Sequence, residues 1–445
     1  MSLLSIFGCG RAKTPEYPAD RLSARDGTEF TITFFKHASL AISVGGKYIY
    51  VDPVSANADY GALPKADVVL ITHSHYDHLD VAAVEKLLAA DTEILCDRTS
   101  AEAFEMNCYT MRPGSVATPR DYVKVEAVAA YNTTPGHLQF HPREREDCGY
   151  VLTIGGTRER HVSNIRFENI AFEHSAWRRP LYEGHVTLQG GFRFIDGYKL
   201  AEPGLFHKAE LENQAWIARP EAAVTAQFAD SIGFSSCTFS HTGATAIDLA
   251  YAVSSSDITG CTFTDIGGTA IMAGWFGEQG FETHIPYTPA IGSDMCNRLT
   301  IERNKITDAA NEDWGCGAVS AGYVRDTEIS GNEVSHVNYS GICVGWGWTP
   351  LESGMRNNRI TGNTVTDYAR QLYDAGGIYT LSNQPGSVIS GNTISMPHPA
   401  PYATNSRAFC IYFDEATDGY TVSDNKMPQE SFGYNRPGKN LKIIK

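Results

Sequence analysis

A short pattern of side chains recurs seven times in the C-terminal part of this 445-residue chain. Each copy has an apolar residue, two variable residues, an Asn or a Cys, one variable residue and a second apolar residue. The Asn or Cys positions are Cys237, Cys261, Asn304, Asn332, Asn363, Asn392 and Asn425. Repeats a few tens of residues long indicate a stacked architecture. The unit is short and lacks helical periodicity, so it is strand-like. The repeat therefore predicts an all-β parallel β-helix over residues 159–445, with one coil per copy.

The repeated Asn residues are predicted to stack at the same turn of successive coils, where their amides bond along the axis of the rod. Cys237 and Cys261 hold the same position and are expected to be small core side chains. The ten cysteines of the chain include no C-x-x-C pair. The sequence therefore supports neither a zinc knuckle nor a disulfide framework.

Residues 28–158 follow a different pattern, in which strands and helices alternate. Leu40–Val51 contains two apolar runs joined by a Gly-Gly pair, which predicts a hairpin. Ala66–Thr72 is an apolar, β-branched run typical of a buried strand. Val81–Ala90 has apolar residues at helical spacing, and Asp80 can cap its start. The alternation predicts an α/β domain before the β-helix.

A cluster of metal-ligand side chains directly follows the predicted strand Ala66–Thr72. His73, His75, Asp77 and His78 lie within six residues. Two His residues two positions apart on a loop can face one cation, and Asp77 with His78 can face a second. Zinc accepts imidazole and carboxylate ligands together, and a metal pair can activate a water for attack on an ester, lactone or amide. The cluster therefore predicts a metal site.

The N-terminal half resembles the metallo-β-lactamase superfamily, and most closely its branch of sugar-lactone hydrolases. The resemblance rests on Lys47–Pro53 (KYIYVDP), the His/Asp cluster and Tyr131–Arg158. It implies an αββα sandwich that binds Zn²⁺. It also implies a third His for the first metal, which matches His141 best and His137 next.

The sequence departs from this family after Gly155–Arg158. The family continues there into a Gly-Asp-Thr turn, whose Asp bridges the two metals, and later supplies another His. Here Glu159–Val162 follows directly, and the chain contains no Gly-Asp-Thr. The resemblance therefore implies an incomplete sandwich over residues 28–158. It also implies an incomplete site that holds one Zn²⁺ ion.

Acidic and aromatic residues gather at the predicted strand ends of the C-terminal half. Glycoside hydrolysis needs two carboxylates that face each other across the bond. Asp374 lies between an aromatic residue and a Gly-rich turn, and Asp414 follows an apolar run. Strands one or two coils apart can bring these two side chains together, so they are the predicted catalytic pair. The predicted sugar-binding residues on the same strand ends are Glu312, Trp314, Trp346, Trp348, Tyr373 and Tyr379.

This half resembles glycoside hydrolase family 141 and related right-handed β-helix proteins. The segments that carry the resemblance include Asn164–Trp177, Asn311–Tyr323 and Tyr373–Gly386. The family includes enzymes that act on fucosides and on xylan. Its carboxylate pair falls on Asp374 and Asp414. The resemblance keeps Asp313 and Glu312 in reserve as carboxylates and implies subsite roles for His174 and His284.

Composition limits the remaining possibilities. The net charge of −15 disfavours nucleic acid, because phosphate binding needs clustered Lys and Arg. No run of 18 apolar residues occurs, so no membrane span is expected. The tail 1–27 begins with apolar residues up to Cys9, which fits either a frayed start or the remnant of a lipoprotein signal. The second interpretation predicts a lipid-anchored periplasmic, outer-surface or secreted protein.

Three functions remain open at this point. The first is a β-helix glycoside hydrolase acting on a polysaccharide or oligosaccharide. The second is a metal-dependent hydrolase of lactones or esters. The third is a non-catalytic glycan-binding fusion. A β-helix lyase is disfavoured because no basic cluster accompanies the acidic positions. The sequence names neither the sugar nor the oligomeric state.

Overall fold

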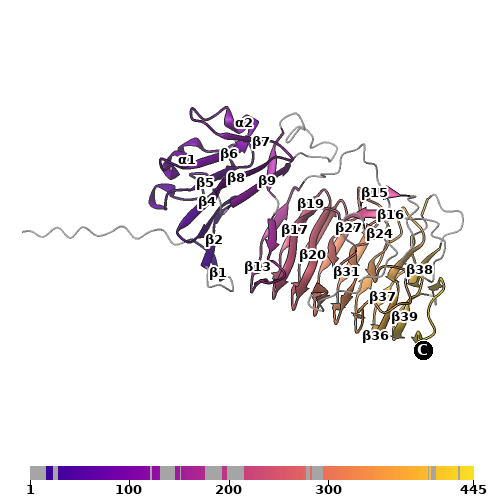
Figure 1. Ribbon diagram of the computed structural model, residues 1–445. Helices are drawn as coiled ribbons and strands as arrows, with labels where there is room; N and C mark the ends of the chain where they lie inside the picture. Colours follow the sequence, from indigo (N-terminus) through magenta and orange to yellow (C-terminus); the bar gives the residue numbers. More distant parts are fainter. Residues whose placement is uncertain are drawn as a thin grey trace, which may run out of the picture. The chain divides into compact units, whose positions relative to one another are not determined.

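A computed structural model describes residues 17–23, 29–120, 123–130, 146–150, 152–175, 193–197, 215–276, 281–282, 294–398, 400–401, 407–428 and 431–444. The chain divides into two compact units (Figure 1). The N-terminal unit is Met1–Ala127 with Gln139–Tyr150, and the β-helix unit is Val128–Leu138 with Val151–Lys445. Among the described residues, no helix is long and apolar enough to cross a membrane.

The N-terminal unit is built on a seven-stranded sheet in chain order. Its strands are β1 (Ala19–Ser23), β2 (Glu29–Lys36), β3 (Ser39–Val44), β4 (Lys47–Val51), β5 (Val68–Ile71), β6 (Glu93–Asp97) and β7 (Tyr109–Met111). The first four strands are antiparallel and the last four are parallel. The predicted hairpin is present, since β3 and β4 pair across Gly45 and Gly46. Both glycines have positive φ, +55° and +77°, which other residues rarely adopt.

A second, three-stranded sheet and short helices complete this unit. They are β8 (Val116–Arg120), β9 (Val123–Ala129), β10 (Cys148–Tyr150), α1 (Val81–Leu87), α2 (Arg98–Ala101) and the 3-10 turn η1 (Tyr60–Ala62). The side chains of β5 alternate between two apolar clusters. Val69 and Ile71 share one cluster with α1, and Val68 and Leu70 share the other with β9. The strand is therefore buried on both faces, as its uninterrupted apolar run predicts.

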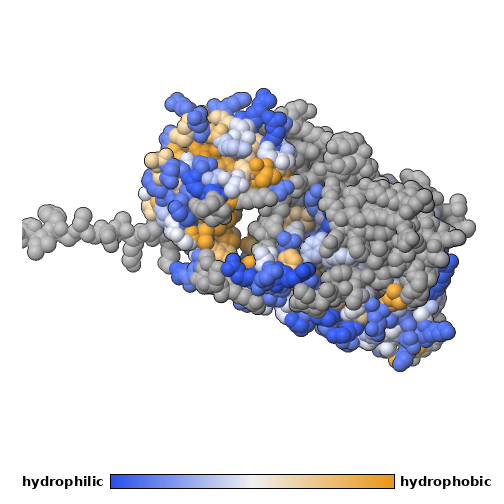
Figure 2. Space-filling view, in the orientation of Figure 1, coloured by the Kyte–Doolittle hydropathy of each residue, from blue (hydrophilic) through white to orange (hydrophobic). Residues whose placement is uncertain are grey.

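The helix α1 is shorter than the sequence predicts, and its predicted cap is present. The helix α1 ends at Leu87 and not at Ala90, because Leu88 is extended (φ −65°, ψ 134°). Its start is capped as expected, since Ala83 N donates to Asp80 Oδ1 over 3.1 Å. Figure 2 shows hydrophobic patches among hydrophilic ones on the visible face of this unit. Met106 and Val116 are two large apolar side chains that the unit exposes.

Three parallel sheets form the β-helix unit. The first sheet has β11 (Leu152–Gly155), β17 (Ala222–Asp230), β20 (Thr245–Ser254), β23 (Ile271–Ala273), β28 (Val319–Ala321), β32 (Ile342–Val344), β35 (Ala375–Thr380), β38 (Ala408–Phe413) and β40 (Phe432–Tyr434), with β12 (Val162–Ser163), β25 (Cys296–Asn297) and β29 (Val324–Arg325) beside this path. The second has β13 (Arg166–Glu168), β18 (Gly233–Ser235), β21 (Asp257–Thr259), β26 (Thr300–Glu302), β30 (Glu328–Ser330), β33 (Arg359–Thr361), β36 (Asn383–Ser390), β39 (Asp418–Ser423) and β41 (Lys442–Ile443). The third has β14 (Ala171–Glu173), β19 (Thr238–Thr242), β22 (Thr262–Ile266), β27 (Lys305–Ala309), β31 (Glu333–Val337), β34 (Thr364–Val365) and β37 (Thr393–Ile394). A small antiparallel sheet joins β15 (Arg193–Gly197), β16 (Ala215–Ala218) and β24 (Phe281–Glu282).

The repeated Asn residues lie between the second and third sheets and form the predicted ladder. Asn304, Asn332, Asn363 and Asn392 each donate from Nδ2 to the Oδ1 of the next Asn, over 2.8 to 3.0 Å. All four are buried. Each amide group thus satisfies the next one along the axis, which fixes the register of neighbouring coils.

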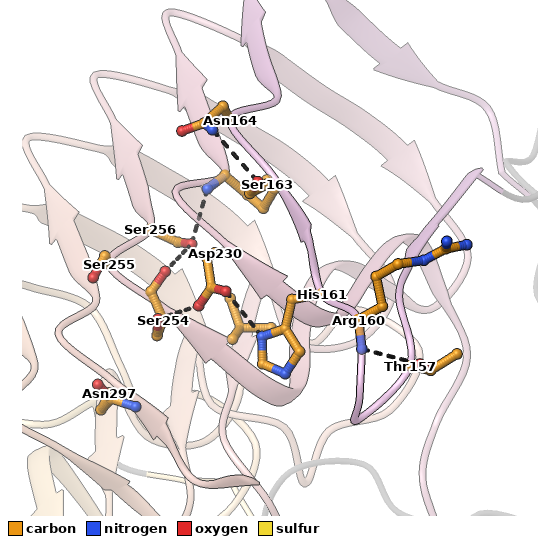
Figure 3. A network of polar contacts seen from close by, with 12 residues as sticks. Thr157, Arg160, His161, Ser163, Asn164, Asp230, Ser254, Ser255, Ser256 and Asn297 are labelled. Atoms are coloured by element: carbon orange, nitrogen blue, oxygen red, sulfur yellow. Dashed lines mark hydrogen bonds and ion pairs between the residues drawn. The ribbon is translucent and has the colours of Figure 1, made fainter. Parts of the chain in front are cut away.

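The β-helix begins before the junction that the sequence suggests after Arg158. Leu152–Gly155 already pairs in parallel with β17. The segment that follows is tied to the second coil by a polar network (Figure 3). In this network His161 Nδ1 lies 3.0 Å from Asp230 Oδ2, and Ser254 Oγ donates to Asp230 Oδ1 over 2.5 Å.

Candidate functional sites

The predicted metal cluster lies on the loop that follows β5. The ring centroid of His73 is 4.7 Å from that of His75 and 4.0 Å from that of His78. His73 is buried, with 7% of its surface exposed. Asp77 is half-exposed at the mouth of the cluster. The loop therefore brings all four predicted metal-ligand residues of this segment into one group.

A buried carboxylate holds this loop against the sheet. Asp52, at the end of β4, is fully buried and accepts hydrogen bonds from Thr72 N over 2.8 Å and Thr72 Oγ1 over 2.6 Å. Its Oδ2 also lies 2.8 Å from His78 Nδ1. When Nδ1 of His78 donates to Asp52, Nε2 keeps its lone pair for a metal. Asp52 thus orients His78, a role that the sequence pattern alone does not indicate.

His37 is the second residue of this site that the sequence analysis missed. It lies in the turn between β2 and β3. Its Nε2 is 3.3 Å from Asp77 Oδ2, and its ring centroid is 5.1 Å from that of His78. His37, Asp77 and His78 each offer one ligand atom, and these three atoms lie within 4.8 Å of one another. The only sequence signal was a His directly after an apolar strand.

The donor types of the cluster fit a divalent transition metal, since imidazole and carboxylate are ligands that zinc prefers. His73, His75, Asp77 and His78 are the described residues predicted to hold it. A bound zinc ion supplies a water of lowered pKa or polarises a carbonyl oxygen. His141 and His137, the predicted third ligand and its alternative, lie outside the described residues, as do Cys9 and His284.

The predicted carboxylates flank two neighbouring strands of the first sheet of the β-helix unit, at opposite ends. Asp374 precedes β35 and Asp414 follows β38, and these strands pair in parallel with Tyr379 opposite Tyr412. The two tyrosine rings meet edge to face, 5.1 Å between centroids. Tyr412 Oη donates to Asp374 Oδ1 over 2.9 Å, and Tyr379 Oη donates to Asp414 Oδ2. Two tyrosines in edge-to-face contact therefore connect the two carboxyl groups.

Asp414 is the buried member of the pair, with 4% of its surface exposed. Asn435 Nδ2, from the last coil, donates to its Oδ1 over 2.7 Å. Burial raises the pKa of Asp414 above the ordinary value of a carboxyl. The hydrogen bonds from Tyr379 and Asn435 oppose this rise, and the negative charge of Asp374 adds to it. Burial also raises the pKa of Tyr379, so its hydroxyl keeps its proton.

Asp374 is the accessible member, because 45% of its side chain is exposed. Its Oδ1 lies 4.0 Å from Arg407 Nε. Its backbone has a φ of +59°, a conformation that costs free energy in residues other than glycine and that recurs at functional sites. Tyr339 Oη donates to its carbonyl oxygen over 2.8 Å. The carboxylate is thus presented to solvent from a firmly held backbone.

The other predicted residues of the β-helix unit occupy different environments. Asp313 is 1% exposed on an earlier coil, where Gly315 N donates to its Oδ1 over 3.4 Å. Trp346 is buried in an apolar cluster with Trp275 and Tyr323, and Trp348 touches this cluster as well as that of Tyr379. Exposed side chains are Trp314 (39%), Tyr373 (49%) and His174, which stacks on His241, while Glu312 is half-buried.

Two family models match the chain. The model described as a beta-lactamase superfamily domain matches residues 31–225, and the model described as a right handed beta helix region matches residues 289–427. The chain combines a metallo-β-lactamase-type unit with a right-handed parallel β-helix. Both predicted resemblances are confirmed at this level, and so is the predicted fold class. The first match continues past Tyr150 through β11 into β17, strands that the structure assigns to the β-helix unit.

Individual relatives resemble each part. A UPF0173 metal-dependent hydrolase from Flavobacterium johnsoniae is 40% identical over 110 residues, which are 23% of this chain and 48% of that protein. One from Pyrococcus furiosus is 29% identical over 142 residues, 30% of this chain and 60% of that protein. A solved structure described as a glycoside hydrolase is 39% identical with a TM-score of 0.63, over 65% of this chain and 49% of that one. The chain thus spans about half the length of the Flavobacterium relative and of the glycoside hydrolase.

Proposed function

We propose that the β-helix unit is a glycoside hydrolase in which Asp414 is the general acid and Asp374 is the base or nucleophile. The observation that carries this proposal is the carboxylate pair itself. The two residues flank neighbouring strands, are joined through Tyr379 and Tyr412, and have different environments. The solved structure that resembles this chain with a TM-score of 0.63 is described as a glycoside hydrolase, which supports the same activity.

The two environments suit the two roles. Asp414 is buried and burial raises its pKa, which suits a residue that donates a proton to the oxygen of the leaving sugar. Asp374 is exposed enough to meet a water or an anomeric carbon. As the glycosidic bond breaks, the proton of Asp414 goes to the leaving oxygen. Water then supplies the hydroxyl of the new reducing end, with Asp374 accepting its proton or forming the glycosyl intermediate.

The proposed substrate is a polysaccharide or oligosaccharide. Tyr373 precedes Asp374 directly and exposes 49% of its surface, so its ring can stack on the apolar face of a sugar. The family resemblance favours a fucoside or a xylan within this class. Such substrates lie at the cell surface or outside, and the proposal therefore includes a periplasmic, outer-surface or secreted location.

Hydrolysis of aryl fucosides and aryl xylosides by the full chain in EDTA tests the proposal. Asp374→Asn and Asp414→Asn are each expected to lower kcat about 10²- to 10⁴-fold. Asp418→Asn is the matched control, because Asp418 lies near the same end of the rod and bonds Asn440. Full activity in both site variants would refute the assignment. Retention of a glycan by the wild-type protein without turnover would support a binding protein.

A second function is proposed for the N-terminal unit, namely metal-dependent hydrolysis of a lactone or ester. The His/Asp cluster and the Flavobacterium relative, which is described as a metal-dependent hydrolase, favour it. This activity is expected to disappear in EDTA and in His75→Ala, whereas Asp374→Asn leaves it unchanged. Lactone hydrolysis that survives chelation would argue against it.

A further inference from the structure

The sequence contains no Gly-Asp-Thr turn, which supplies a ligand of the second metal in the family that the N-terminal unit resembles. We propose that His37 fills this gap and binds a divalent transition-metal ion together with Asp77 and His78. The inference goes beyond glycoside hydrolysis and does not depend on it. It assigns a ligand to a residue from a different part of the sheet, 36 to 41 positions before the His/Asp loop.

The three side chains already converge. The distance from His37 Nε2 to Asp77 Oδ2 is 3.3 Å, and the one ligand atom of each residue lies within 4.8 Å of the others. Zinc binds nitrogen and carboxylate oxygen at about 2.0–2.2 Å, so two ligands of one ion stand at most about 4.4 Å apart. Small side-chain rotations of His37 or Asp77 are enough to reach this geometry.

The backbone at His37 is held in a conformation that sets the direction of the ring. Its φ is +52°, in a two-residue turn between β2 and β3. Glycine or asparagine is usual at such a position. His is one of the non-glycine residues that adopt positive φ more often than most, so the turn accepts the imidazole at this position.

Two of the three proposed ligands, His37 and Asp77, are open to solvent, and His78 is 17% exposed and keeps one ring nitrogen for the metal. Asp52 takes the Nδ1 side of His78, so Nε2 of His78 is left for the metal. The side chains of His37 and Asp77 are 53% and 42% exposed. Two imidazoles and one carboxylate leave further coordination positions open, which suits zinc, cobalt or iron in the divalent state.

Metal binding by the full chain tests the inference without any assay of activity. The chelator-treated protein is titrated with Zn²⁺ against a chromophoric chelator and, separately, with Co²⁺ while its visible absorption is recorded. His37→Asn keeps a residue that tolerates positive φ but is too short to reach the ion. We expect about a 10- to 100-fold loss of Zn²⁺ affinity at one position and an altered Co²⁺ spectrum.

The β-helix unit offers a matched control. His336 also has a positive φ, +57°, is 55% exposed, and places Nε2 3.4 Å from Asp367 Oδ2, but it has no third metal-ligand residue within reach among the described residues. His336→Asn is expected to leave both titrations unchanged. If His37→Asn misfolds, Asp77→Asn must reproduce the loss at the same position. Wild-type affinity and spectrum in folded His37→Asn would overturn the inference, whatever Asp77→Asn does.

Discussion

Removing one amide from the middle of the Asn ladder is expected to destabilise the β-helix unit strongly. Asn363 is fully buried and makes four hydrogen bonds through its side chain. Its Nδ2 donates to Ile329 O over 2.9 Å and to Asn392 Oδ1 over 3.0 Å, and its Oδ1 accepts from N and Nδ2 of Asn332, each over 2.9 Å. Asn363→Ala leaves these partners buried without it. Since a buried polar group that loses its partner costs about 1–3 kcal/mol, we expect a loss of about 3–5 kcal/mol.

The end of the same ladder provides the control. The Nδ2 of Asn425 donates to Ile389 O, and its Oδ1 accepts from N and Nδ2 of Asn392, but this residue is only half-buried. Water can replace the lost amide there, so Asn425→Ala is expected to cost about 1 kcal/mol.

Urea unfolding followed by tryptophan fluorescence measures both variants. All six tryptophans of the chain lie after residue 176, so the signal reports on the β-helix unit and not on the N-terminal unit. The midpoint is expected to fall at an unchanged m value. The reasoning fails if Asn363→Ala costs less than Asn425→Ala, because burial would then not decide the cost of a lost rung.

Two further substitutions have defined outcomes. Asn435→Leu removes a donor that lowers the pKa of Asp414, so this pKa should rise further and the alkaline limb of kcat/KM should move to higher pH. Asn440→Leu, in the same coil, should leave the limb in place. If the limb stays in place in both variants, Asn435 does not influence the pKa of the catalytic acid. Arg219→Met leaves the carboxylate of Asp248, only 2% exposed, without its paired guanidinium, which should cost about 3–5 kcal/mol in urea unfolding. Adding Asp248→Leu should recover most of this loss, and no recovery would show that the guanidinium acts mainly through packing on neighbouring rings.

The repeated pattern is enough to predict most of the β-helix, because it is a local signal that returns in every coil. An apolar residue before each Asn and another after it determine which side chains enter the interior, and the parallel pairing of all three sheets confirms the prediction. The amide ladder follows from the same register. The alternating pattern before it, with a strand buried on both faces and a capped helix, likewise suffices for the α/β class of the N-terminal unit.

The sites are harder to derive, because their contacts are tertiary. His37 reaches Asp77 across the sheet, and no spacing in the sequence signals that approach. The register of β35 and β38 places Tyr379 opposite Tyr412, but the sequence does not tell whether that face is covered, and Tyr379 proves to be 1% exposed. The same holds for Trp346, an expected sugar platform that lies in an apolar cluster. Its role in binding a sugar remains a prediction.

The position of a bound glycan tests the central proposal most directly. A crystal structure of Asp374→Asn soaked with an oligosaccharide that the wild-type protein cleaves would trap the substrate before hydrolysis. We predict that the glycosidic oxygen lies within about 3 Å of the Asp414 carboxyl, with the anomeric carbon facing residue 374. A glycan held on another sheet of the rod, or cleavage that persists in this variant, would contradict the proposed acid and base.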